Sequence, residues 1–90
     1  PAVLRAIDNT VTAAHAGDAW VGMCGEMAGD PALTSLLVGL GLDELSMSAV
    51  TIPAVKARIV ETDTGEAAAL AADALTCSTR EDVRALLELE

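Results

Sequence analysis

The sequence is poor in aromatic residues and in cations. One tryptophan and no phenylalanine or tyrosine accompany a 52% hydrophobic fraction, so the core must be built largely from small and aliphatic side chains that each bury little area. Five Lys and Arg residues oppose fourteen Asp and Glu residues, and the formal net charge is −9. Such a surface repels phosphate backbones and anionic lipids, and we therefore expect neither nucleic acid nor a membrane surface as a partner.

Cysteine, too, is scarce. Cys24 and Cys77 form neither a CxxC pair nor a disulfide framework, so we expect reduced thiols in a cytoplasmic protein. The sequence shows no signal-peptide pattern, and no apolar run in it is long enough to cross a bilayer. The sequence of 90 residues opens with proline rather than methionine, and we expect a fragment of a longer protein. The shortage of lysine beside many carboxylates suits a salt-rich cytoplasm, where repulsion is screened.

Apolar periodicity predicts an α/β chain with two parallel strands. Residues 2–16 have helical spacing and end at Gly17. Residues 20–23 form a short apolar run, and residues 44–48 alternate polar and apolar side chains, with Leu45 and Met47 on one side, as in a strand. A helix between the two strands starts at the Asp30–Pro31 pair.

Three further helices are predicted after the second strand. Pro53 lies near the start of the first, which carries Ile52, Val55 and Ile59 on its apolar side and Lys56 and Arg58 on a solvated side. The last two helices begin with capping-box pairs, Asp63 with Glu66 and Ser78 with Glu81. The buried side of the first is rich in alanine over residues 67–74, and the buried side of the second carries Val83, Leu86 and Leu87.

Cys24 is the residue best placed for chemistry. It follows the first predicted strand, and Gly22, Gly25 and Gly29 surround it, so the backbone can turn out of the sheet there. Active sites of α/β proteins lie at such carboxyl ends of strands. On spacing alone, a buried packing role for the thiol is the alternative, because free cysteine is often buried. For Cys77, packing is the interpretation that we prefer.

Two strings carry a family resemblance. GMCGEMAGD and GLDELSMSA, in this order and separation within residues 15–56, resemble the end of the phosphoenolpyruvate-binding barrel of Enzyme I of the sugar phosphotransferase system. Pyruvate phosphate dikinase and phosphoenolpyruvate synthase resemble the strings less closely. The resemblance implies that residues 1–90 are the C-terminal part of a TIM (β/α)8 barrel, about its last two βα units with trailing helices.

The resemblance also implies chemistry for Cys24. In Enzyme I, phosphoenolpyruvate gives its phosphoryl group to a histidine, and the enolate of pyruvate that remains takes a proton at carbon 3; the family motif places the proton donor at Cys24. An ordinary thiol is mostly protonated at neutral pH, and no Lys or Arg lies within ten residues to favour a thiolate. The family further implies Mg²⁺ held outside this segment, a histidine phosphocarrier protein reached through a missing N-terminal domain, and a homodimer.

Several polar residues have ordinary roles as alternatives. His15, in a last helical turn, favours the helix dipole, and the phosphorylated histidine of the family belongs to a separate domain. Glu26 either orients the thiol or pairs with an arginine of another strand. Ser46 and Ser48 hydrogen-bond within the barrel or stabilise it, and Asp43 and Glu44 are not assigned as metal ligands. Besides the enzyme fragment, which alone is expected to be inactive, we retain an interaction module that self-associates through its open faces.

Overall fold

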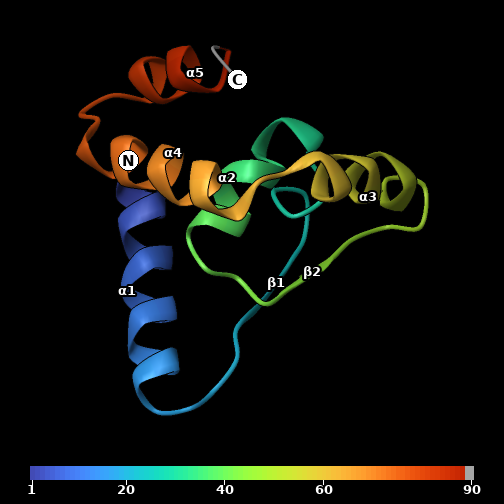
Figure 1. The fold of residues 1–90 in the computed structure, drawn as a ribbon, viewed down its shortest axis with the longest axis horizontal. Helices are drawn as coiled ribbons and strands as arrows, with labels where there is room; N and C mark the ends of the chain where they lie inside the picture. The colour runs from blue at the N-terminus through green and yellow to red at the C-terminus, as the bar shows by residue number, and fades with distance from the viewer. Residues whose placement is uncertain (89–90) are drawn as a thin grey trace.

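The computed structural model describes residues 1–88 (Figure 1). These residues form five α-helices, one 3-10 helix and two strands. In chain order the elements are α1 (Ala2–Ala16), β1 (Gly22–Cys24), η1 (Pro31–Leu33), α2 (Thr34–Gly39), β2 (Glu44–Ser46), α3 (Ile52–Glu61), α4 (Thr64–Thr76) and α5 (Arg80–Glu88). In Figure 1, α1 stands across the line of α4, and the two strands lie beneath α2 and α3. The predicted α/β class is thus confirmed.

The two strands form a parallel pair, as predicted. Gly22, Met23 and Cys24 are paired with Glu44, Leu45 and Ser46 in that order. Met23 and Leu45 are half-buried and pack against the core, whereas their neighbours on both sides are exposed. The alternation predicted for the second strand is therefore confirmed, but its pairing ends at Ser46 rather than at residue 48.

The first strand begins later than predicted. It covers Gly22–Cys24 instead of residues 20–23, and Trp20 lies outside it with 67% of its surface exposed. The Val21 N–H donates to the carboxylate of Asp43, the residue before β2, rather than to a backbone carbonyl of that strand. The strand ends at Cys24, one residue later than the apolar run.

Helix α2 packs on α4 through small residues. Leu36, Leu37 and Leu40 are buried on the α2 side, and Ala67, Ala71 and Ala74 are buried on the α4 side. A Cβ atom added to Gly39 would overlap the backbone carbonyl of Ala67, so the two helices approach backbone to backbone. The prediction that the alanine strip admits a close neighbouring helix is confirmed.

Helix starts are predicted correctly at two of three caps. The Asp30 carboxylate accepts from the Ala32 N–H at 3.0 Å, but a 3-10 turn precedes α2, so the predicted single helix is divided. Asp63 accepts from the Glu66 N–H at 3.0 Å and caps α4. The cap predicted at Ser78 is wrong, because Thr79 accepts from the Asp82 N–H at 3.1 Å and α5 starts at Arg80.

Helix α3 departs from its predicted apolar side. Val55 is buried, yet Ile52 and Ile59 are 41% and 44% exposed, because α3 lies at the edge of the layer in Figure 1 and only one side contacts α2 and η1. Lys56 is exposed as predicted, whereas Arg58 is half-buried rather than solvated. The α5 stripe is confirmed, with Val83 buried and its two leucines half-buried.

A two-stranded sheet leaves one edge of each strand without a strand partner in the described part of the chain. The architecture accommodates the end of a (β/α)8 barrel, in which further strands would flank this pair, and the barrel itself stays a prediction. Across residues 1–88, no helix combines the length and the apolarity needed to cross a bilayer.

Candidate functional site

Cys24 is the last residue of β1 and lies opposite Ser46, the last residue of β2. Its side chain is exposed, and the cysteine is free. Parallel strands bring their carboxyl ends to one edge, so the thiol and the Ser46 hydroxyl share that edge. The alternative of a buried packing role for Cys24 is therefore wrong for this chain.

The turn after β1 is held by one glycine and one buried side chain. Gly25 has φ of +108°, a conformation that side chains with a Cβ rarely adopt, and this sends the chain out of the sheet directly after Cys24. Ala28 is fully buried and Met27 packs on the core, which anchors the far end of the turn. Glu26 remains exposed between these anchors.

The turn after β2 packs directly against the turn after β1. A Cβ on Gly29 would lie 3.1 Å from Thr51 Oγ1 and 3.3 Å from Met47 Cβ, so glycine allows this close approach. The Thr51 hydroxyl donates to the Ser48 carbonyl at 2.9 Å and closes the second turn. Thr51 was not predicted as a residue of the site. A threonine just before Ile52–Pro53 is typical of a helix start, and this signal could have identified it.

The two turns enclose an open pocket of about 650 Å³ beside the thiol. Cys24, Glu26, Ser46 and Ser48 line it, together with Gly25, Gly29, Met47 and Thr51. Its lining therefore combines one thiol, three hydroxyls and a carboxylate, and it includes no cation of residues 1–88. The structure brings together Cys24 and three of the residues whose roles the sequence left open, namely Glu26, Ser46 and Ser48.

Glu44 orients Ser46. The Ser46 hydroxyl donates to Glu44 Oε1 at 3.0 Å, and the two residues are two apart on one strand, so both side chains lie on the face that carries Cys24. Gly22 is the partner of Glu44 across the sheet, and a Cβ there would lie 3.4 Å from the Glu44 Cβ. The absent side chain leaves room for the carboxylate.

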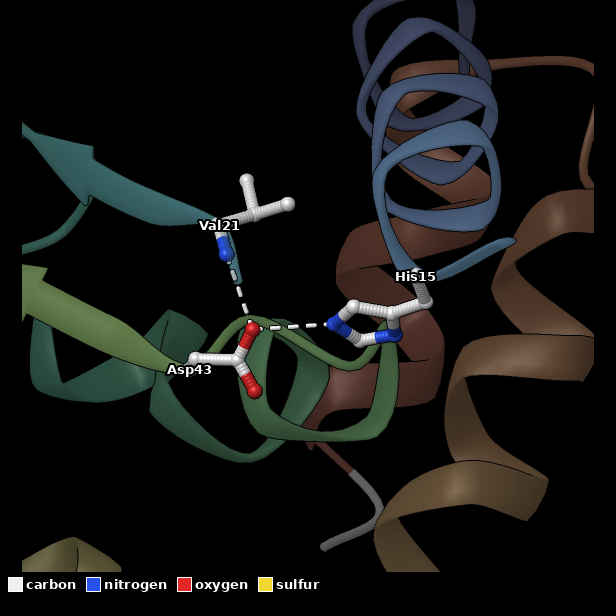
Figure 2. A network of polar contacts seen from close by, with 3 residues as sticks. All are labelled: His15, Val21 and Asp43. Atoms are coloured by element: carbon white, nitrogen blue, oxygen red, sulfur yellow. Dashed lines mark hydrogen bonds and ion pairs between the residues drawn. The ribbon is translucent and has the colours of Figure 1, made fainter. Parts of the chain in front are cut away.

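His15 and Asp43 meet at the opposite end of the strands from Cys24. His15 Nε2 lies 2.9 Å from Asp43 Oδ2, and the same oxygen accepts from the Val21 N–H at 2.8 Å (Figure 2). The hydrogen bond from His15 and then that from Val21 lower the pKa of Asp43. His15 thus lies in the last turn of α1, as expected. It also has a carboxylate partner, Asp43, that its position in the sequence did not reveal.

Cys77 lies apart from this site, at the end of α4. Its side chain is half-buried against the core, and Sγ donates to the Asp73 carbonyl at 3.6 Å. Its packing role is confirmed. As for metals, residues 1–88 contain no group of three or more His, Cys, Asp or Glu side chains arranged to hold an ion.

Comparison with known proteins places this geometry in context. The family model described as PEP-utilising enzyme, PEP-binding domain matches residues 1–64. The chain is 66% identical over all 90 residues to a phosphoenolpyruvate-protein phosphotransferase of Haloferax volcanii, of which it spans 16%. It is 49% identical over 87 residues to multiphosphoryl transfer protein 2 of Escherichia coli, of which it spans 10%. It is 51% identical over 89 residues to a phosphoenolpyruvate-protein phosphotransferase of Enterococcus faecalis, again spanning 16% of the relative.

Proposed function

Because the chain belongs to the family of PEP-binding domains of PEP-utilising enzymes, we propose that it supplies the proton donor of a phosphoenolpyruvate-protein phosphotransferase. The observation that carries the proposal is the exposed Cys24 thiol at the carboxyl end of β1, facing a pocket that two βα turns enclose. The names of the relatives support this activity over that of a pyruvate phosphate dikinase.

The proposed step is the protonation of an enolate. Once the phosphoryl group of phosphoenolpyruvate has passed to a histidine elsewhere in the protein, the enolate of pyruvate carries an electron pair that can attack a proton. The S–H bond of Cys24 breaks, the electron pair forms the new C–H bond at carbon 3, and the thiolate remains. Pyruvate then leaves with a methyl group.

The surroundings of Cys24 support an acid rather than a nucleophile. The carboxylate of Glu26 lines the pocket and no Lys or Arg of residues 1–88 does, whereas reactive cysteine nucleophiles typically lie beside a cation. The Ser46 hydroxyl, held by Glu44, stands beside the thiol on the same edge of the sheet. We propose that it helps to orient the thiol toward the substrate.

The rest of the site belongs to the longer protein. Phosphate recognition needs paired cations, and this pocket has none in the described part of the chain, so the proposed phosphate and Mg²⁺ ligands lie outside the segment. The relatives' names support a phosphocarrier partner, which we assign to the histidine phosphocarrier protein. The two free cysteines support the proposed cytoplasmic location, and the open sheet edges support the proposed homodimer or self-association.

Solvent exchange tests the role of Cys24 in the full-length enzyme. In the reverse direction the thiolate abstracts a methyl proton from bound pyruvate, so solvent deuterium should enter the methyl group. We expect Cys24→Ala to lower this exchange by about a hundredfold to ten-thousandfold, with little change in phosphoenolpyruvate affinity. Cys77→Ala, directly after α4, is the matched control and should exchange normally. Normal exchange in Cys24→Ala would show that another group is the donor.

A further inference from the structure

Asp43 holds Val21 at two points. Its backbone N–H donates to the Val21 carbonyl at 2.8 Å, and its carboxylate oxygen Oδ2 accepts from the Val21 N–H at 2.8 Å. One residue before β2 therefore binds both polar groups of one residue before β1. A reciprocal pair of this kind fixes the relative position of two backbones along their length, which a single hydrogen bond does not.

His15 holds the carboxylate from a third side. Figure 2 shows its ring reaching from the end of α1 to the oxygen that Val21 also contacts. The side chains of His15 and Asp43 are 42% and 40% exposed, and an ion pair so exposed to water adds little stability. We therefore assign its importance to geometry, because it limits the rotation of the carboxylate and ties α1 to both strands.

The register that this contact fixes decides what stands beside Cys24. Only three residue pairs make up the ladder, and in only one of them, Met23 with Leu45, do both side chains pack against the core, so the hydrophobic pattern alone gives the register little support. A slip of one residue would turn Cys24 toward the core, because side chains alternate between faces. A slip of two would bring Cys24 opposite Ser48 or Glu44 and would remove Gly22 from its place beside Glu44.

We propose that Asp43 is a positioning residue for Cys24, because it holds β1 and β2 in the register that places Cys24 opposite Ser46 in the lining of the pocket. The catalytic importance of Asp43 rests on the proposed function, whereas its effect on the register of β1 and β2 does not. Glu44 shares this register, because it is paired with Gly22 across the sheet and its carboxylate accepts from the Ser46 hydroxyl beside Cys24.

Disulfide trapping in this chain measures the register without reference to catalysis. In a Cys77→Ala background, Ser46→Cys places a second thiol opposite Cys24, and strands in the native register hold paired Cα atoms within the range of about 4.4–6.8 Å that a disulfide needs. We expect rapid crosslinking on mild oxidation. Adding Asp43→Ala should slow this crosslink about tenfold or more and should speed the crosslink in the matching Ser48→Cys variant.

Conservative variants keep the test decisive. Asp43→Asn retains an oxygen for the Val21 N–H and should restore most of the Cys24–Ser46 crosslinking, and His15→Ala should fall between the two. Helical circular dichroism identifies any variant that fails to fold. If Asp43→Ala does not fold, His15→Ala and Asp43→Asn carry the comparison. Two results would contradict the proposal that Asp43 fixes the register. One is crosslinking at the parent rate in folded Asp43→Ala and His15→Ala, and the other is equal slowing in Asp43→Asn and Asp43→Ala.

The full-length enzyme connects the register to catalysis. Asp43→Ala should lower pyruvate methyl exchange by about a hundredfold, because a misplacement of about 1 Å can cost that much, while the KM for phosphoenolpyruvate stays within a factor of about three. Asp43→Asn should recover the exchange rate. If trapping confirms that Asp43 fixes the register but Cys24→Ala exchanges normally, the proposed function fails and the register assignment stands. If trapping is unchanged, the inference fails whatever the role of Cys24.

Discussion

Gly39 lies against the backbone carbonyl of Ala67, so α2 and α4 meet with no side chain between them at that point. This close approach of the two helices is possible because residue 39 is a glycine. It lies where the buried leucines on the α2 side pack against the buried alanines of α4. Met23 and Leu45 of the strand pair pack against the same core. Loss of the approach should therefore loosen the support of the site as well as the core.

Gly39→Ala should destabilise the protein. The new methyl group would overlap the Ala67 carbonyl, and α4 would have to move, at a cost of about 1–3 kcal/mol in the free energy of unfolding. Gly17→Ala is the matched control, because a Cβ there meets only the Ala14 and Ala13 carbonyl oxygens at 3.7 and 3.8 Å and φ is −96°. Urea unfolding of both variants checks the difference, and an equally stable Gly39→Ala would contradict the packing.

Acid should remove the contribution of Asp43. The hydrogen bond from His15, followed by that from Val21, lowers the pKa of Asp43 below 3.8, so the folded state binds its proton more weakly than the unfolded state does. This stabilisation is complete above the unfolded pKa and is lost as the pH falls through the folded pKa. The free energy of unfolding of Asp43→Asn should therefore approach that of the parent on acidification.

A matched carboxylate on α4 provides the control for this acid effect. Asp73 is exposed on that helix, far along the chain from the strands, and Asp73→Asn controls for the loss of one negative charge. Unfolding by urea at a series of pH values measures both variants. A gap between parent and Asp43→Asn that stays constant down to the lowest pH would contradict the role of the His15 and Val21 contacts.

The chain alone should not bind phosphoenolpyruvate tightly. The pocket beside Cys24 has Glu26 in its lining and no Lys or Arg of residues 1–88, whereas a phosphate needs paired cations. Calorimetry with phosphoenolpyruvate and Mg²⁺ should show no heat of binding in the micromolar range, and the full-length enzyme serves as the positive control. Micromolar affinity of the chain would mean that its own residues form the phosphate site.

The chain should self-associate. Each strand has an edge without a strand partner in the described part of the chain. Val50, in the turn before α3, and Val60, on α3, expose 89% and 85% of their surface. Open edges and apolar patches favour assembly. Light scattering should show a mass that rises with concentration, and Val60→Glu should reduce the rise. A cooperative monomer at all concentrations would contradict this prediction.

Salt should stabilise the chain. The net charge of −9 places repelling carboxylates close together, and the screening length falls from about 10 Å at 0.1 M salt to about 3 Å at 1 M. The midpoint of thermal unfolding should rise with potassium chloride. A variant with Glu61→Lys and Glu81→Lys, both exposed, should depend less on salt. Equal stability of the parent in dilute buffer and in molar salt would contradict the expectation.

Local signals predict most of the fold. Apolar spacing defines α1 to its last residue, and the Asp30 and Asp63 carboxylates mark helix starts, because each depends on chemistry within four residues. The prediction for the cap of α5 fails because two alternatives lie side by side. Ser78 with Glu81 and Thr79 with Asp82 offer similar chemistry one residue apart, and in the structure Thr79 accepts from the Asp82 N–H.

The site is predictable only in part. Cys24 follows from a strand, a glycine turn and a family resemblance, and all of these are visible in the sequence. The contact of His15 with Asp43 joins residues 28 positions apart and depends on where α1 ends relative to both strands. Thr51 was hidden differently: its hydroxyl has the chemistry of a helix cap, yet in the structure it bonds backward to the Ser48 carbonyl.

The exposed Trp20 has a practical consequence for spectroscopy. The sequence has no tyrosine, so this indole is the chain's one strong ultraviolet fluorophore, and 67% of its surface faces water in the folded state. Its emission should therefore be red-shifted before unfolding begins and should change little on denaturation, which makes it a poor monitor of folding. The same placement, beside β1, makes it a sensitive reporter of assembly. A blue shift of the emission on mixing this chain with another segment or a second copy would show that the surface around Trp20, just before β1, has been covered.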